Sequence, residues 1–185
     1  MGFVCAHEVV EAPEASPTRS AFVLHGILGS RGNWRGFARA MVRAHPDWRL
    51  VLVDLRGHGE SHGAAGPHTV AACAADLDRL AVELGERPAA VVGHSFGGKV
   101  ALAYARDHGR GLEAVWSLDS PPGKSDAGAA GGEVAGVIEA IREAPMPVES
   151  RQVIVRHFEA AGFGEGIAGW MTTNLRRGEA GFTWV

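Results

Sequence analysis

Residues 89–105 have the sequence AAVVGHSFGGKVALAYA, which joins a short apolar run to an amphipathic pattern. The run at 89–92 predicts a buried strand, and the pattern at 96–107 predicts a helix. Between them, the motif Gly93-His94-Ser95-Phe96-Gly97 fits G-x-S-x-G, which in a strand–turn–helix setting indicates a nucleophile elbow. We therefore expect Ser95 at the amino end of the helix, where aligned N–H groups favour negative charge. The alternative is an ordinary serine N-cap.

The same alternation of strand and helix runs through the first 119 residues. Buried strands are predicted at 22–24, 50–54, 89–92 and 114–119. Amphipathic helices are predicted at 34–44, 70–84 and 96–107. Strict alternation is typical of βαβ units, so we expect an α/β fold with a mostly parallel sheet and helices on both faces. Residues 4–10 predict one more strand at the edge of the sheet.

The composition of the chain changes after Asp119. Residues 120–132 are rich in Pro, Gly and Ala and predict a loop. Three helical patterns follow, with no strand between them, at 134–143, 150–161 and 167–175. We therefore predict an α/β core at 1–125 and a C-terminal helical cap at 126–185.

A second glycine-containing motif, His25-Gly26-Ile27-Leu28-Gly29, comes directly after the strand predicted at 22–24. Acyl transfer needs two backbone N–H groups aimed at the oxyanion of the tetrahedral intermediate. We expect one from Phe96, just after the nucleophile, and the other from Ile27, with Leu28 as the second choice. His25 is expected to brace this loop by hydrogen bonds rather than to act as a base. Alone, the motif also fits a plain glycine-rich turn.

The third motif, Asp54-Leu55-Arg56-Gly57-His58-Gly59-Glu60-Ser61, follows the strand predicted at 50–54. With His62 and His68 it contains several side chains that can bind metals, but their spacing matches no regular ligand pattern. We therefore predict no metal site. Asp54 and Arg56 are expected to tie down the loop that leaves the strand.

The composition is that of an ordinary globular protein. The chain has 185 residues, of which 46% are hydrophobic, and its 21 acidic and 18 basic side chains leave a formal net charge of -3. This balance disfavours nucleic-acid binding, and the short apolar runs predict no membrane span. The two cysteines, Cys5 and Cys73, are expected to be buried thiols in a reducing compartment. We therefore predict a cytoplasmic protein that binds neither nucleic acid nor membranes.

Three segments, HGILGS, DLRGHGES and GHSFGGKVALAYA, occur in this order and resemble the α/β-hydrolase superfamily. The match is to its small capped serine esterases of the abhydrolase type. The resemblance implies that Ser95 is the nucleophile and that Ile27 and Phe96 form the oxyanion hole. It also implies a small-molecule ester or acyl thioester substrate, an acyl-enzyme intermediate and no cofactor.

The acid and the base of the catalytic triad are less evident. The family order is serine, acid, histidine, and Asp119 is the candidate acid; otherwise it anchors the turn at Pro121-Pro122. The one histidine after Asp119 is His157, in a predicted cap helix, where we expect it to pack. The family's histidine follows the last strand of the sheet. The resemblance therefore implies a chain without its last strands and its base, with little activity alone.

Two other readings remain open. Residues 93–99 also match the first seven positions of a nucleotide-binding P-loop, but Val100 stands where a Ser or Thr should hold Mg²⁺. Within the same fold, cofactor-free haloperoxidases, lyases and non-catalytic binding proteins are alternatives to an esterase.

Overall fold

The computed structural model describes residues 3–123 and 129–184, which divide into two units, Met1–Pro122 and Gly123–Val185. The predicted boundary between residues 125 and 126 lies outside the described residues. Each unit is described by itself, and the assignment of the second as a cap stays a prediction.

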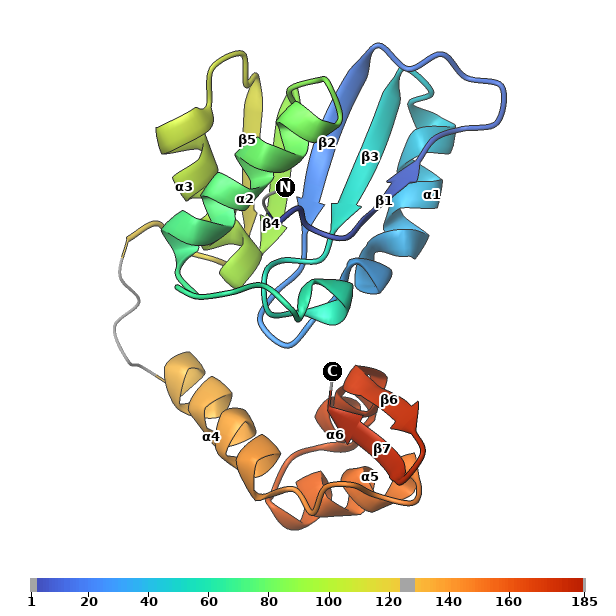
Figure 1. Ribbon diagram of the computed structural model, residues 1–185, viewed down its shortest axis with the longest axis vertical. Coiled ribbons are helices and arrows are strands. Elements are labelled where there is room, and N and C mark those ends of the chain that lie inside the picture. Colours follow the sequence, from blue (N-terminus) through green and yellow to red (C-terminus); the bar gives the residue numbers. More distant parts are fainter. Residues whose placement is uncertain (1–2, 124–128, 185) are drawn as a thin grey trace. The chain divides into compact units, whose positions relative to one another are not determined.

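The first unit contains a five-stranded sheet in the order β1-β3-β2-β4-β5 (Figure 1). The strands are β1 (His7–Val10), β2 (Arg19–Leu24), β3 (Trp48–Val53), β4 (Ala90–His94) and β5 (Ala114–Leu118). The helices are α1 (Arg35–Ala44), α2 (Val70–Glu83) and α3 (Phe96–His108), with short 3₁₀ turns at Arg31–Trp34 and Gly59–Ser61. Strands β2 to β5 are parallel, and β1 pairs antiparallel to β3 at one edge. The mostly parallel α/β fold and the N-terminal edge strand are confirmed.

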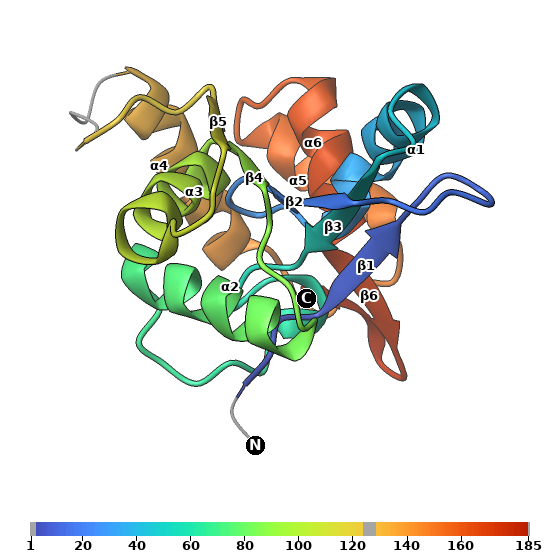
Figure 2. The same cartoon turned by 90° about the horizontal axis from the view of Figure 1, so that it is seen from above.

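Alternate residues of the central strand β2 face opposite layers of helices. Phe22 and Leu24 belong to a cluster with the buried residues of α2 and α3, whereas Ala21 and Val23 pack with those of α1. This is the two-residue period of a strand covered on both faces. Seen from above in Figure 2, the strands pass between α1 on one side and α2 and α3 on the other.

The parallel pairing brings the carboxyl ends of the strands to one edge of the sheet. In the register, Leu24 of β2 is paired with both Val53 of β3 and Gly93 of β4. The loops that begin at His25 and Asp54 and the turn at Ser95 therefore leave the sheet at the same level. Ligands of such sheets bind outside this edge.

Two buried ion pairs hold the loop that follows β3. The guanidinium of Arg56 donates to both carboxylate oxygens of Asp76, with Nε–Oδ2 at 2.6 Å and Nη2–Oδ1 at 2.9 Å. Asp54 accepts hydrogen bonds from the N–H of Arg31 at 2.7 Å and that of Glu60 at 3.0 Å, and it pairs with the Arg31 side chain. The prediction that Asp54 and Arg56 tie down this loop is confirmed.

Both cysteines of the first unit are buried free thiols, as predicted. Burial raises the pKa of Cys5 to about 12 and that of Cys73 to about 11. Neither thiol is therefore a reactive thiolate near neutral pH.

The second unit consists of helices and one hairpin. The helices are α4 (Ala129–Glu143), α5 (Arg151–Ala160) and α6 (Glu165–Met171), and the hairpin joins β6 (Leu175–Gly178) to β7 (Gly181–Trp184). The helix predicted at 167–175 is therefore wrong at its end, because the chain passes through a 3₁₀ turn at Thr172–Asn174 and enters β6. Phe182 exchanges backbone hydrogen bonds with Val148, at 2.7 and 2.9 Å, and this pairing stabilises a strand that local sequence does not predict.

Within the described ranges, none of the helices combines the length and apolar character needed to cross a membrane.

Candidate active site

Ser95 forms a sharp turn between β4 and α3. Its backbone has φ 51° and ψ −115°, outside the favoured regions for a residue with a side chain. The N–H of Ser95 donates to the Leu118 carbonyl at the end of β5 at 2.9 Å, and its own carbonyl accepts from Gly98 at 2.9 Å. The strained backbone is therefore held from both sides. Ser95 is half-buried at the edge where the parallel strands end.

The two glycines of the G-x-S-x-G motif lie where the backbone has no room for a side chain. A Cβ atom on Gly93 would lie 2.1 Å from the carbonyl oxygen of Gly97. A Cβ atom on Gly97 would lie 2.5 Å from the carbonyl oxygen of His25. The turn can therefore form only with glycine at both positions.

The loop after β2 passes directly against the turn at Ser95. A Cβ atom built on Gly26 would lie 3.4 Å from the Cβ of Ser95 and 3.0 Å from Nδ1 of His94. The loop closes into a tight turn, since the N–H of Gly29 donates to the Gly26 carbonyl at 3.1 Å and Leu28 has a left-handed φ of 60°. The two motifs, nearly 70 residues apart in sequence, thus meet at one point.

His25 fixes the orientation of this loop. The side chain is buried, and its Nε2 accepts the backbone N–H of Leu55 at 3.1 Å. Because an N–H group can only donate, the ring proton must be on Nδ1, which donates to the Gly26 carbonyl at 2.8 Å. The Gly26 C=O and the Ile27 N–H belong to one trans peptide and point in opposite directions. The hydrogen bond from His25 therefore also orients the N–H of Ile27.

Burial keeps this imidazole neutral. Desolvation lowers the pKa of His25 to about 4, with a smaller opposing effect from its hydrogen bond to the Gly26 carbonyl. A neutral ring is required here, because a doubly protonated ring would lose the hydrogen bond from Leu55.

The His58 ring lies near His25, in the loop that contains Ile27, and near Phe96, the first residue of α3. Its ring centroid is 5.0 Å from that of His25 and 6.2 Å from that of Phe96, on which it stacks at 27°. Burial lowers the pKa of His58, and its Nδ1 lies 3.0 Å from the Arg56 carbonyl. From the sequence, His58 is considered only as a possible metal ligand, because its distance along the chain from His25 and Phe96 gives no sign that the rings meet.

Asp119 ends β5 on the same edge of the sheet. Its side chain is 92% exposed, its backbone has a left-handed φ of 49°, and its Oδ2 lies 4.0 Å from Nε2 of the half-exposed His94. The Pro121 carbonyl accepts a hydrogen bond from the Lys99 ammonium, so it is Lys99 that anchors this turn. The assignment of Asp119 as the acid stays a prediction.

His157 lies in the second unit. Its Nε2 is 2.8 Å from the Ala140 carbonyl, and its ring contacts Phe158 edge-on at 5.7 Å. It therefore packs α5 against α4, as the sequence predicts. Among residues 3–123 and 129–184, no three His, Cys, Asp or Glu side chains are grouped so as to hold a metal ion.

Comparison with known families agrees with this geometry. The family described as alpha/beta hydrolase fold matches residues 22–141. The sn-1-specific diacylglycerol lipase ABHD11 of Mus musculus is 31% identical over 168 residues, which cover 87% of this chain and 52% of that protein. The 2-succinyl-6-hydroxy-2,4-cyclohexadiene-1-carboxylate synthase of Serratia proteamaculans is 33% identical over 113 residues, 56% of this chain and 39% of that protein.

Among solved structures, a marine microorganism esterase superposes with a TM-score of 0.87 and 22% identity. The match covers 98% of this chain and 67% of the esterase, and at this identity it establishes a common fold. The chain spans about half or less of the length of both curated relatives.

Proposed function

Because the chain belongs to the α/β hydrolase fold family, we propose that it carries the nucleophile and the oxyanion hole of a serine hydrolase. The substrate class is a small-molecule carboxylic ester or acyl thioester. One observation carries the proposal most: the backbone of Gly26, which precedes the proposed donor Ile27, lies against the strained Ser95.

In the proposed reaction, Ser95 Oγ attacks the substrate carbonyl and forms a tetrahedral intermediate. The N–H groups of Ile27 and Phe96 stabilise its oxyanion. A general base takes the serine proton and transfers it to the alcohol or thiol leaving group. This group departs, and the acyl group stays bound to Ser95 as the acyl-enzyme. Water then attacks the ester bond of the acyl-enzyme, which releases the carboxylic acid product and regenerates Ser95.

We assign the base to neither His25 nor His58. Both ring nitrogens of His25 are hydrogen-bonded, and His58 lies against the Arg56 carbonyl and the Phe96 ring. We propose that a further histidine accepts the proton, oriented by an acid for which Asp119 is the candidate. Without such a base, the 185-residue chain should be slower by a factor on the order of 10³ or more.

The names of the relatives support acyl chemistry. The mouse protein is named as a diacylglycerol lipase, whose substrate contains carboxylic esters. The Serratia protein is named as a synthase, so a non-hydrolytic reaction on the same scaffold is the second candidate. Covalent labelling of the serine distinguishes the two, because only the first requires an acyl-serine.

The test is labelling of the 185-residue chain by a fluorophosphonate, followed by intact mass, with and without imidazole as a substitute base. We expect a slow single adduct that imidazole accelerates. Ser95→Ala should abolish it, and the exposed Ser16→Ala should label like the wild type. An adduct that persists in Ser95→Ala, or no adduct even with imidazole, would overturn the proposed function.

A further inference from the structure

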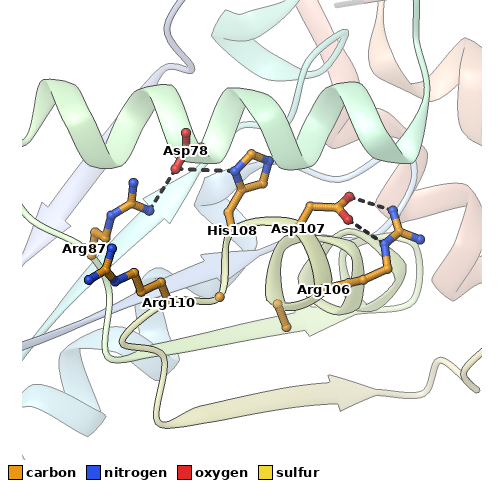
Figure 3. A pocket seen from close by; sticks show the side chains of 8 residues that line it. Asp78, Arg87, Arg106, Asp107, His108 and Arg110 are labelled. Carbon is orange, nitrogen blue, oxygen red and sulfur yellow. Dashed lines mark hydrogen bonds and ion pairs between the residues drawn. The ribbon is translucent and has the colours of Figure 1, made fainter.

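A second candidate site lies at the other end of α3. There a pocket of about 420 Å³ is lined mainly by charged side chains (Figure 3). These are Asp78, Arg87, Arg106, Asp107, His108 and Arg110. Ser95 precedes the first residue of α3 and the pocket surrounds its last, so the 13-residue helix separates them by about 20 Å. The reaction proposed for Ser95 therefore does not involve these residues.

One arginine of the pocket is fully neutralised. Arg106 donates to both oxygens of the neighbouring Asp107, with Nε–Oδ1 and Nη2–Oδ2 both at 2.6 Å. This bidentate pair adds no net charge. The remaining charged groups are Asp78, Arg87, His108 and Arg110.

A single carboxylate orients two of these groups. Oδ1 of Asp78 accepts from Nη1 of Arg87 at 2.8 Å and lies 3.5 Å from Nδ1 of His108. The His108 ring also stacks on the buried Tyr104, with centroids 5.8 Å apart. Arg87 and His108 are thus positioned by α2 and α3, while each keeps further nitrogen atoms for a ligand.

Arg110 has no hydrogen-bond or ion-pair partner within residues 3–123 and 129–184. The backbone around Arg110 takes a course that favours glycine on either side. A Cβ atom on Gly109 would lie 2.2 Å from the Ala105 carbonyl oxygen, and Gly111 has a left-handed φ of 83°. Figure 3 shows Arg110 and Arg87 on the same side of the pocket, with the Arg106–Asp107 pair on the other. On that side the carboxylate of Asp78 pairs with Arg87, and Arg110 has no carboxylate partner among the described residues.

We propose that this pocket binds a phosphate group, as inorganic phosphate or as a small phosphate monoester, between Arg110 and Arg87 with His108 beside them. Arg87 and Arg110 line the same side of the pocket, and their like charges repel each other unless an anion binds there. Their planar N–H forks match the oxygens of phosphate. Two guanidinium groups offer more N–H donors than the two oxygens of a carboxylate accept, which favours phosphate.

The test is calorimetric titration of the whole chain with inorganic phosphate, glycerol 3-phosphate and acetate, each at an ionic strength matched with sodium chloride. We expect saturable binding of phosphate that Arg110→Ala weakens about tenfold or more. Arg110→Lys keeps the charge without the planar fork, so it should bind with intermediate affinity. Arg39→Ala removes an exposed arginine of α1 and should bind like the wild type.

Tighter binding of glycerol 3-phosphate than of phosphate would identify a monoester as the ligand, and the reverse would identify free phosphate. Acetate binding as tightly as phosphate would overturn the proposal, as would no saturable binding, or equal affinities of wild type and Arg110→Ala. Circular dichroism of each variant verifies that it is folded. If Arg110→Ala does not fold, equal affinities of wild type and Arg110→Lys overturn the proposal.

Discussion

Nε2 of His25 accepts a hydrogen bond from the backbone N–H of Leu55, at 3.1 Å and across 30 residues of sequence. The bond joins the loop after β2 to the loop after β3. Through the opposite ring nitrogen, the same side chain holds the Gly26 carbonyl and thereby the peptide that carries the Ile27 N–H. The proposed oxyanion donor is therefore positioned by a histidine that need not touch the substrate.

Replacing His25 should destabilise the first unit. In His25→Ala, the Leu55 N–H and the Gly26 carbonyl lose their partner in a buried position, and the ring leaves a cavity. We expect the free energy of unfolding to fall by about 2–4 kcal/mol, as measured by urea denaturation. The control is His45→Ala, an exposed position just after α1, where the change should stay within about 0.5 kcal/mol.

The same histidine should make stability depend on pH. The folded pKa of about 4 lies below the ordinary histidine pKa of 6.5, so only the unfolded chain gains a proton between these values. Stability is unaffected above pH 6.5 and should fall as the pH drops towards 4, by about 3 kcal/mol in total from this group. Urea denaturation from pH 7.5 to 4.5 should show a steeper decline for wild type than for His25→Gln. Parallel curves would contradict the assignment.

Glycine substitutions should separate the nucleophile turn from an ordinary helix position. Gly93→Ala places a methyl group 2.1 Å from the Gly97 carbonyl oxygen and should destabilise by about 3 kcal/mol or more. Gly36→Ala, in α1 with no atom within 4 Å of its Cβ, should stabilise by about 0.5–1 kcal/mol. Thermal unfolding of both variants is the measurement, and opposite signs are expected.

The buried ion pair between Arg56 and Asp76 should matter more than an exposed one. Asp76→Ala leaves the guanidinium of Arg56 buried without its partner and should destabilise by about 3–5 kcal/mol. Asp107→Ala removes an exposed partner of Arg106, and no measurable change in unfolding is expected. Urea denaturation of the two variants compares a buried with an exposed pair of the same chemistry.

The exposed face of β5 should promote self-association of the 185-residue chain. Trp116 is 59% exposed on β5, the strand at the end of the sheet order, and Leu118 of the same strand is also exposed. Edge strands with exposed apolar side chains pair with other chains. Trp116→Thr keeps the preference for strand and should shift sedimentation velocity profiles towards monomer. A profile unchanged at all concentrations would contradict this role of Trp116.

The sequence predicts the parts of the fold that local patterns determine. The apolar run at 89–92 and the helix after Ser95 required only hydrophobic periodicity, and the glycines of the elbow mark a turn that no larger residue can form. The motif at 25–29 likewise predicted a backbone loop, and the structure brings Gly26 against Ser95.

What the sequence does not predict depends on contacts between distant segments. The hairpin of β6 and β7 forms against Val148, so the helical pattern near residue 170 gives no warning of it. The stacking of His58 on Phe96 joins the loop after β3 to the first residue of α3, and the spacing of the two residues in the sequence gives no sign of it. Asp119 lies near His94, is highly exposed and has a positive φ, which is uncommon for residues other than glycine, and no local pattern predicts these features.

The hydrogen bond from the Ser95 N–H to the Leu118 carbonyl ties the nucleophile turn to the outermost strand of the sheet. Outer strands fray first, since they are hydrogen-bonded to a neighbour along one side. Fraying of β5 would break this bond and expose the Ser95 amide to solvent. Hydrogen exchange at this one amide would therefore report how often the sheet opens beside the proposed nucleophile, and any molecule that closes the β5 edge would slow that exchange.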